Sequence, residues 1–352
     1  EKYNDLELAS FSELLTPGTV TRDDAIRTAI ATSQTGHIVP TADAQPVLIS
    51  NGVDEIVPAY MTDEFSVIAE EDGKVIDIDD GFMIVQYKSN KKRAIEVGHR
   101  QSFNSGSGFY IDNKLKPALN VGDSFKKNDV LAYHEQFFSQ DIDGVVRMNI
   151  GPLAKVAFTG IYATYEDAGI VTEKMSKRLA TKLSMCQEIK LHASDDIEKI
   201  VKPGDEVEVE DPLVTFGLGD TGDKSVDNFL RAFQMDANGN NTFLDKAKRT
   251  VNAEHAGRVA MIKMYTNQSL DKLSPSLRKL LEKHFQENIK KRAILDKHDG
   301  GPSSYKMGLV YEYPTEPIKA PTIKGRSCDV LIEVYIEHED EAGIGDKCAA
   351  YG

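Results

Sequence analysis

The residue types best suited to chemistry in this chain are two adjacent carboxylates, Glu166 and Asp167. They lie between apolar, strand-like residues in the run from Asn149 to Met175. Adjacent residues of a strand point to opposite faces, so the pair places charge on both sides of the backbone. Asp and Glu are seldom buried without a partner. Taken alone, the pair favours a solvated strand end over a site that needs negative charge.

Other patterns that could bind a ligand are weaker. Gly217–Gly222 fits a Gly-x-Gly-x-x-Gly string, but no βαβ unit surrounds it, and Asp223 stands where a phosphate loop needs lysine. A dinucleotide-binding enzyme resting on this string stays a third hypothesis, which a shift of melting temperature by NAD or ATP would test. Asp236–Asn241 resembles a calcium loop, but its twelfth position is Ala247 instead of glutamate. Both stretches therefore favour flexible turns.

Composition sets outer limits on the function. The chain has 352 residues with 56 acidic and 42 basic side chains, and its net charge is -14. This length accommodates two or three domains. No apolar run approaches the roughly 20 residues that span a bilayer, so no membrane segment is expected. An acidic protein is not an obvious nucleic-acid binder, although net charge says little about a single groove.

The ends and the cysteines give further expectations. The polar start at Glu1, without methionine, suggests a fragment or a processed chain without a signal peptide. Cys186, Cys328 and Cys348 are widely spaced and form no zinc knuckle. A sparse and odd number of cysteines suits a reducing cytoplasm, so we expect a cytoplasmic protein.

The pattern of apolar residues predicts helices at the N-terminus and strands after it. Residues 1–35 favour two helices separated at Pro17-Gly18, and the second helix, from Thr21, carries Arg27. From about residue 38 to 140 the pattern is β, with a hairpin over 74–87 that turns at an Asp-Gly pair.

The C-terminal third contains one clear helix and one clear strand. Ser274 is a good N-cap with Pro275 at the first helical position. The residues expected on the apolar face of that helix are Leu277, Leu280, Leu281, Phe285 and Ile289. Residues 329–337 predict a strand.

Two segments share one pattern of turn and apolar residues. Val121–Leu131 and Val201–Val214 each contain a Gly-Asp turn, an apolar residue, a second aspartate and then an apolar pair. Such a pattern makes a tight turn and returns the chain to a core. It predicts an internal repeat of a small β-barrel or barrel-sandwich type.

Three pairs of motifs occur in a fixed order: Arg22–Arg27 with Ile38–Pro40, Val156–Phe158 with Tyr165–Glu173, and Val334–Ile336 with Ile344–Ala349. In this order they resemble the central and catalytic part of the beta (second-largest) subunit of multisubunit DNA-dependent RNA polymerases. The chain is much shorter than a usual beta subunit and divergent. In these respects it is similar to the split beta subunits of giant bacteriophage polymerases.

The sequence departs from the family pattern at two places. Gly36-His37 stands where the family has Arg-Gln, and Tyr351-Gly352 stands where the family has Arg-His. The N-terminal lobe regions and the downstream stretch with a second active-site lysine are also absent from this sequence.

The resemblance implies a fold. The expected class is mainly β with α (α+β), a double-psi β-barrel with barrel-sandwich-hybrid, flap-like insertions. The implied domains are a helical, fork-adjacent segment with the Asp-Asp-x-x-Arg motif (1–60), a barrel-sandwich-like β region (61–140), the double-psi β-barrel that forms the active-site half (141–190 plus 325–352), a flap-like barrel-sandwich insertion (191–270), and a helix with a linker (271–324).

The resemblance also implies an enzyme subunit, a DNA-directed RNA polymerase (nucleotidyltransferase). Lys347, Glu166 and Asp167 would be the catalytic residues, and the two carboxylates would act indirectly on a second Mg²⁺. Arg27, His37 and Lys347 would contact NTP phosphates and RNA. The family's metal-holding Asp-Phe-Asp-Gly-Asp loop is missing from this sequence. A beta-prime-like partner would therefore hold most of the Mg²⁺.

Further partners follow from the same resemblance. They are the remaining beta-subunit segments, template DNA, nascent RNA, NTPs and a promoter-specificity factor, with no membrane. A phage-encoded chain would work in the host cytoplasm or be packaged in the virion. The alternative hypothesis is a non-catalytic β-barrel scaffold or interaction subunit of a nucleic-acid-processing complex.

Overall fold

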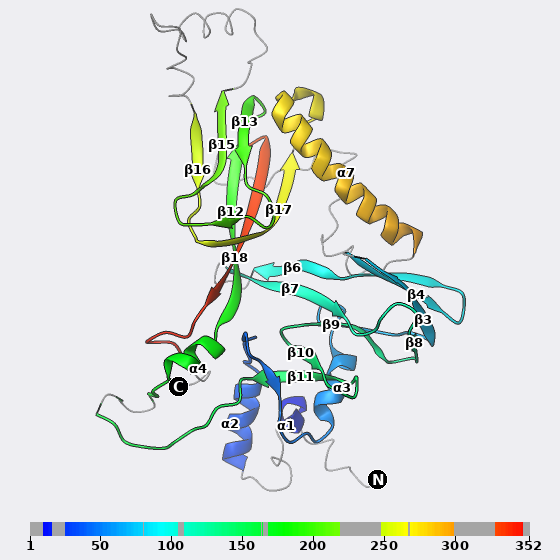
Figure 1. Ribbon diagram of the computed structural model, residues 1–352, viewed down its shortest axis with the longest axis vertical. Helices are drawn as coiled ribbons and strands as arrows, with labels where there is room; N and C mark the ends of the chain where they lie inside the picture. The colour runs from blue at the N-terminus through cyan, green and yellow to red at the C-terminus, as the bar shows by residue number, and fades with distance from the viewer. Residues whose placement is uncertain are drawn as a thin grey trace, which may run out of the picture.

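The computed structural model describes residues 10–15, 25–79, 81–104, 109–162, 164, 168–218, 248–266, 268–298 and 328–347. Strands dominate these residues, and a small number of helices accompany them (Figure 1). The expectation of a mainly β chain with some helices is confirmed. The segments Gly219–Gly222 and Asp236–Asn241 lie outside the described residues.

The N-terminal part joins short helices to a small sheet. The helices are α1 (Phe11–Leu15), α2 (Ala25–Thr35) and α3 (Val53–Tyr60). The sheet has the order β1 (Gln45–Pro46), β11 (Val146–Gly151) and β10 (Phe138–Gln140). Leu15, Val57 and Phe138 are buried in one apolar cluster that holds these elements together. The predicted helical character of this region is confirmed for α1 and α2.

A larger sheet runs through the middle of the molecule in the order β14-β17-β18-β12-β7-β9-β2, with β6 paired to β7. Its strands are β2 (Ser66–Ile68), β6 (Gly98–Asn104), β7 (Phe109–Pro117), β9 (Val130–His134), β12 (Thr181–Leu191), β14 (Glu206–Val207), β17 (Gly257–Thr266) and β18 (Val330–Asp340). The antiparallel pair β12 and β18 is continuous, from Thr181 opposite Asp340 to Leu191 opposite Val330. The predicted C-terminal strand is confirmed.

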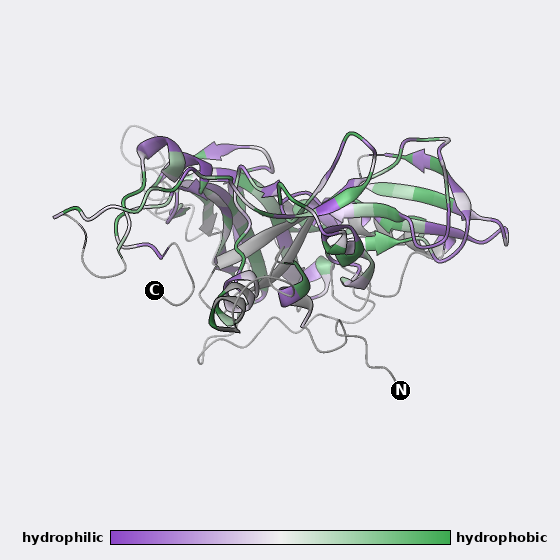
Figure 2. Cartoon of the chain, turned by 90° about the horizontal axis from the view of Figure 1, so that it is seen from below, coloured by the Kyte–Doolittle hydropathy of each residue, from purple (hydrophilic) through white to green (hydrophobic). Residues whose placement is uncertain are grey.

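The first module consists of β2, β3, β4, β8 and β9, within residues 66–87 and 124–134. A sheet of order β5-β4-β3-β8 contains β3 (Gly73–Ile78), β4 (Phe82–Tyr87), β5 (Lys92–Glu96) and β8 (Ser124–Phe125). The predicted hairpin is confirmed, because β3 and β4 pair and Asp79 Oδ1 accepts the N–H groups of Gly81 and Phe82 at 2.9 and 2.7 Å. Hydrophobic strands fill this region in Figure 2.

The second module consists of β14, β15, β16, β17 and β18, within residues 206–218, 249–266 and 330–340. A sheet of order β13-β15-β16 contains β13 (Asp195–Ile200), β15 (Pro212–Leu218) and β16 (Arg249–Asn252). Leu213, Val259 and Ile336 are fully buried in the core of this module.

The two modules confirm the predicted internal repeat. In the first, Asp123 and Asp129 each accept a backbone N–H, from Asn120 at 2.8 Å and from Lys126 at 2.7 Å. In the second, Asp205 and Asp211 accept the N–H groups of Lys202 and Glu208, both at 2.8 Å. Each aspartate therefore closes a turn that returns an apolar strand to the core.

Helix α7 (Pro275–Lys297) joins the second module to β5 (Figure 1). It follows the short 3-10 helix η2 (Leu270–Lys272). Ser274 Oγ accepts the N–H of Leu277, which confirms the predicted N-cap. Leu277, Leu281 and Phe285 are buried, whereas Ile289 is 38% exposed, so the predicted apolar face ends one turn early.

Pairing between strands runs across the implied domain boundaries. Strand β7 pairs with β12, and β17 pairs with β18 along eight positions of the register. Elements assigned to the flap-like insertion thus share one sheet with β18. The boundaries themselves stay a prediction.

Candidate functional site

The five residues predicted for the site differ in how far the structure describes them. Glu166 and Asp167 lie outside the described residues, and Arg27 is described only as part of the backbone of α2. His37 and Lys347 are both exposed. His37 Nδ1 lies 2.7 Å from the carbonyl oxygen of Ser33, so its ring is held at the end of α2.

The segment around the carboxylate pair differs from the strand that was predicted. Residues 152–161 follow β11 without regular secondary structure, and no described strand pairs with them. Val156 is 74% exposed, Phe158 99% and Tyr162 102%. The prediction of a strand at Val156–Phe158 is therefore wrong for this chain, because the described residues supply no neighbouring backbone to complete its hydrogen bonds. We call residues 152–162 together with 168–171 the exposed segment.

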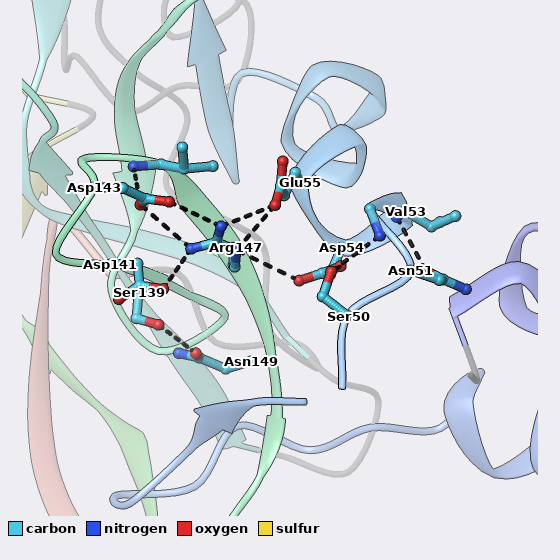
Figure 3. Close-up of polar contacts among 12 residues, drawn as sticks. Ser50, Asn51, Val53, Asp54, Glu55, Ser139, Asp141, Asp143, Arg147 and Asn149 are labelled. Carbon is cyan, nitrogen blue, oxygen red and sulfur yellow. Dashed lines mark hydrogen bonds and ion pairs between the residues drawn. The ribbon is translucent and has the colours of Figure 1, made fainter. Parts of the chain in front are cut away.

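Arg147 lies on β11, the strand that leads into the exposed segment, and makes several ion pairs with acidic residues (Figure 3). Its guanidinium pairs with Glu55 at 2.8 Å, Asp141 at 2.5 Å and Asp143 at 3.0 Å, and lies 3.8 Å from Asp54. Hydrogen bonds from Arg147 lower the pKa of the Asp143 carboxyl, and those to Asp143 and Glu55 raise the pKa of the guanidinium. These contacts tie β11 to α3 and to the β10–β11 turn.

Arg178 lies beyond the other end of the exposed segment. It is the last residue of α4 (Glu173–Arg178), whose first turn is capped by Thr172. Its Nε donates to Asp43 at 2.5 Å, and its Nη1 donates to the carbonyl of Leu153 at 2.9 Å. The bond from Arg178 lowers the pKa of the Asp43 carboxyl. One side chain thus holds the helix after the exposed segment to the first residues of that segment and to the loop after Pro40.

Two further bonds attach the loop after Pro40 to the start of β12. The hydroxyl of Thr181 donates to the carbonyl of Pro40 at 2.9 Å, and the N–H of Ala42 donates to the carbonyl of Ala180 at 2.7 Å. The first motif region, which ends at Pro40, therefore lies against the end of α4.

The third motif region also reaches α4. Ser176 Oγ donates to the carbonyl of Ala342 at 2.5 Å, directly before the Gly343–Lys347 loop. Asp346 Oδ2 accepts the N–H of Gly343 at 2.6 Å, and Gly345 has a φ of 98° that favours glycine. Lys347 leaves this turn exposed, and its side chain makes no ion pair with any described residue.

The structure thus brings three motif regions, far apart in the sequence, together around one short helix. Arg178 contacts Asp43 and Leu153, which flank the first and second regions, and Ser176 contacts Ala342, just before the last motif of the third. This convergence places two predicted residues, His37 and Lys347, on segments that connect to the same helix. The distance of Glu166 and Asp167 from either lies outside what is described.

No group of three or more His, Cys, Asp or Glu side chains among the described residues is arranged to hold a metal ion. In the described part of the chain, no helix is both long and apolar enough to cross a membrane.

Comparison with known proteins adds an independent observation. The chain is similar to the beta subunit of bacterial DNA-directed RNA polymerases. It is 29% identical to that subunit from Thermus thermophilus over 164 residues, which are 44% of this chain and 13% of the relative. It is 29% identical to that of Chlamydia felis over 181 residues, 49% of this chain and again 13% of the relative. No protein-family model matches.

The similarity covers a limited part of those proteins. The chain spans about 13% of the length of the curated relatives that it matches. The matched residues support a likeness to polymerase beta subunits over this part of their length.

Sequence reasoning missed Arg147 and Arg178. Arg178 had a weak signal, because basic residues in the last turn of a helix suit its dipole. Its partner Asp43 is 135 positions away, and Arg147 and Glu55 are 92 positions apart, so only the fold reveals either pair.

Proposed function

We propose that this chain is part of the beta subunit of a multisubunit DNA-directed RNA polymerase and contributes to template-directed RNA synthesis. The observation that carries the proposal is the convergence of the three motif regions around α4. The similarity to bacterial beta subunits supports the same function. The continuous pairing of β12 with β18 supports a double-psi β-barrel built from 141–190 plus 325–352, since it joins the two pieces.

The basic residues of the predicted site would bind phosphate groups. Nucleotidyl transfer is an in-line attack of the RNA 3′ hydroxyl on the α-phosphate, with pyrophosphate leaving. Lys347 would neutralise phosphate charge that develops in the transition state. Arg27 and His37 would bind phosphates of the NTP or RNA. The guanidinium of Arg27 can pair with phosphate oxygens in a bidentate way, and a ring N–H of His37 can donate to one.

The carboxylates would serve the metal-dependent part of the site. Mg²⁺ is the expected cofactor, which the aspartate loop of a beta-prime-like partner would mainly hold and which would stabilise negative charge on phosphate oxygens. Glu166 and Asp167 would supply negative charge near a second ion. The exposed segment supports the need for a partner, since side chains such as Phe158 remain in solvent here.

The finer assignment follows the resemblance. We propose a divergent, split beta subunit of the giant-phage type, which works with the remaining beta segments and a promoter-specificity factor on template DNA. The divergence from the family pattern at Gly36-His37, where the family has Arg-Gln, supports this assignment.

Reconstitution with a beta-prime-like subunit tests the site. Lys347→Ala should reduce elongation about 100-fold, because it removes one preorganised charge from the transition state. Asp167→Ala should reduce elongation and raise the Mg²⁺ concentration that is needed. Lys174→Ala, an exposed lysine of α4, is the matched control and should leave elongation unchanged. Full elongation by both Lys347→Ala and Asp167→Ala would show that the assignment is wrong.

Arg178 is proposed as a positioning residue, and its test separates positioning from folding. Arg178→Lys keeps the charge but loses the fork that reaches both Asp43 and Leu153. We expect a lower elongation rate at saturating NTP with an unchanged unfolding midpoint. If the elongation rate falls together with the unfolding midpoint, the role of Arg178 is merely structural.

Co-purification separates the enzyme from a scaffold. A polymerase subunit should co-purify with a partner that carries the Asp-Phe-Asp-Gly-Asp loop. Stable assembly with nucleic-acid-processing proteins that lack such a loop would instead favour the non-catalytic interaction subunit.

A further inference from the structure

Helix α7 carries a row of lysines on its outer face. Lys279, Lys283, Lys290 and Lys297 are all exposed. At 3.6 residues per turn they lie within about 40° of one another around the helix, and the row extends for roughly 27 Å. The chain as a whole has a net charge of -14, so this row is a local reversal of sign.

The row is opposite to the face that fixes the helix. Leu277, Leu281 and Phe285, on the other side of α7, are buried in the core of the second module. The first half of the helix is therefore held by its apolar side, opposite the row. Near the helix end Ile294, which lies beside the row, packs against Phe82 and Ala94, and Lys290 and Lys297 stay exposed next to that contact. A rigid helix keeps their spacing constant, so ligand binding would not have to order the backbone.

The lysines are not neutralised within the described chain. No hydrogen bond or ion pair between their side chains and any described residue is present, although Glu282 and Glu287 lie on the same helix. Surface ion pairs of the type Glu–Lys at i, i+4 would be the ordinary use of such residues. Their absence here leaves four positive charges available along one line.

The positive charge continues past the end of the helix. The carbonyl of His298 accepts the N–H of Ala94 on β5 at 3.1 Å, so the helix end lies against the first module. Burial, together with the charges of Lys297 and Lys92, lowers the pKa of His298. Lys92 is itself exposed on β5 and extends the row onto the neighbouring sheet.

We propose that this lysine row of α7 binds the phosphate backbone of a nucleic acid. A line of lysines on a rigid rod matches the regular negative charge of such a backbone, and lysine binds phosphate as a point charge without reading sequence. An anionic lipid surface fits less well, because membrane-binding helices insert their apolar face. Leu277, Leu281 and Phe285 of α7 are already buried. The inference extends the proposed function by a surface separate from the predicted active site, but it rests on α7 alone.

The test measures binding by the full chain, without a partner, NTP or Mg²⁺. Fluorescence anisotropy would use a labelled 20-nucleotide RNA, the DNA strand of the same sequence and the corresponding duplex, between 50 and 200 mM salt. The variant Lys279→Gln/Lys283→Gln/Lys290→Gln/Lys297→Gln should bind at least about tenfold more weakly at the lowest salt. The slope of log affinity against log salt should decrease by about 3 for single strands.

Two further variants make the result specific. Lys116→Gln/Lys126→Gln/Lys174→Gln/Lys202→Gln removes four exposed lysines elsewhere and lowers the net charge equally, so it should keep the affinity and slope of the unchanged chain. Replacing the four α7 lysines by arginine keeps the charge and should also retain binding, with the helix content checked by circular dichroism.

The outcomes are distinct. Binding by RNA or by DNA with the expected lysine dependence supports the inference, and the comparison of the three nucleic acids identifies the source of the phosphates. Equal loss in both glutamine variants, or no binding at 50 mM salt, would overturn it. So would lysine-dependent binding to vesicles with 30% anionic lipid but not to nucleic acid. None of these results requires elongation, so failure here leaves the proposed active site untouched.

Discussion

The first and second modules build the same β structure from pieces that occur in opposite order along the chain. In the first, the strands β2, β3 and β4 precede β8 and β9; in the second, β14 and β15 precede β16, β17 and β18. The strand pairs correspond nonetheless. Gly73 lies opposite Phe125 as Gly257 lies opposite Val207.

The correspondence extends to irregularities. A register shift between Val75 and Asp77 in the first module has its counterpart between Val259 and Met261 in the second. A shared bulge is a specific feature of a backbone and not a by-product of strand propensity. The two modules therefore share the same local backbone conformation, even though the connections between their strands differ.

The surfaces of the two modules differ where the backbones agree. The turn that contains Lys126 and Lys127 in the first module contains Glu208 and Val209 in the second. The aspartates that cap the turns are kept, and the exposed residues between them change sign. This contrast indicates that backbone hydrogen bonds and close contacts define the module, while its charge is free to serve different partners.

The largest effect is expected at the paired glycines. A methyl group at Gly73 would lie 2.4 Å from the carbonyl oxygen of Gln86, and one at Gly257 would lie 2.3 Å from that of Glu337. Gly257 also has a φ of 152°, which other residues rarely adopt. We expect Gly73→Ala to lower the free energy of unfolding by about 2 kcal/mol and Gly257→Ala by about 3 kcal/mol or more.

Urea unfolding followed by circular dichroism measures both changes. Gly217→Ala is the control, since nothing lies within 4 Å of a methyl group there, and it should change stability little. If Gly73→Ala were as harmless as the control, the close approach of β3 and β4 would not be a shared constraint.

A smaller and matched effect is expected at the turn aspartates. Asp123→Ala and Asp205→Ala each remove a side-chain acceptor from a backbone N–H at 2.8 Å. Each should lower the free energy of unfolding by about 1 kcal/mol, because the N–H loses its partner at a tight turn. Thermal unfolding of the two variants should give equal shifts. A difference of more than twofold would mean that the turns are not equivalent.

The sequence predicted the repeat because turn chemistry is local. Gly-Asp followed by a second aspartate is visible within a dozen residues, and so are the N-cap at Ser274 and the Asp79 turn. The chain order of the strands could not be predicted in the same way. Pairing of Gly257 with Val207 depends on residues 50 positions apart, which no local pattern specifies.

The candidate site was less predictable than the fold. The motif around Gly343–Lys347 contains its own turn signal, and the structure has a turn there. The segment after Pro152 has the apolar residues of a strand, yet it has no strand partner in the described chain. An apolar pattern indicates that a segment will be buried against other residues. It does not indicate whether those residues belong to this chain or to a partner.

The next smaller effect on stability is expected at a strained turn position that carries a different residue in each module. Asn128 and Glu210 both have a φ of 72°, in the left-handed region. Asparagine adopts this conformation at less cost than glutamate. Glu210→Asn should therefore raise the free energy of unfolding by about 0.5 kcal/mol, and Asn128→Glu should lower it by about the same amount. Differential scanning calorimetry of both variants checks the reciprocity, and two changes of the same sign would contradict it.

The smallest effect is a dependence on pH that only the first module should show. The Asp72 carboxylate accepts hydrogen bonds from the ammonium of Lys88 at 2.7 Å and from the N–H of Lys127 at 2.9 Å. These bonds lower the pKa of Asp72 from 3.8. Ala256 precedes Gly257 where Asp72 precedes Gly73, so the second module lacks this carboxyl.

A carboxyl whose pKa is lower in the folded state stabilises that state above its unfolded pKa, and this contribution is lost as the pH falls through the folded pKa. Asp72→Ala, which gives the first module the residue of the second, should therefore lower the unfolding midpoint at pH 6 and have a smaller effect near pH 2.5. Lys88→Gln removes the main cause of the pKa shift and should reproduce part of the loss at pH 6. A loss that is equal at both pH values would assign the role of Asp72 to packing instead of charge.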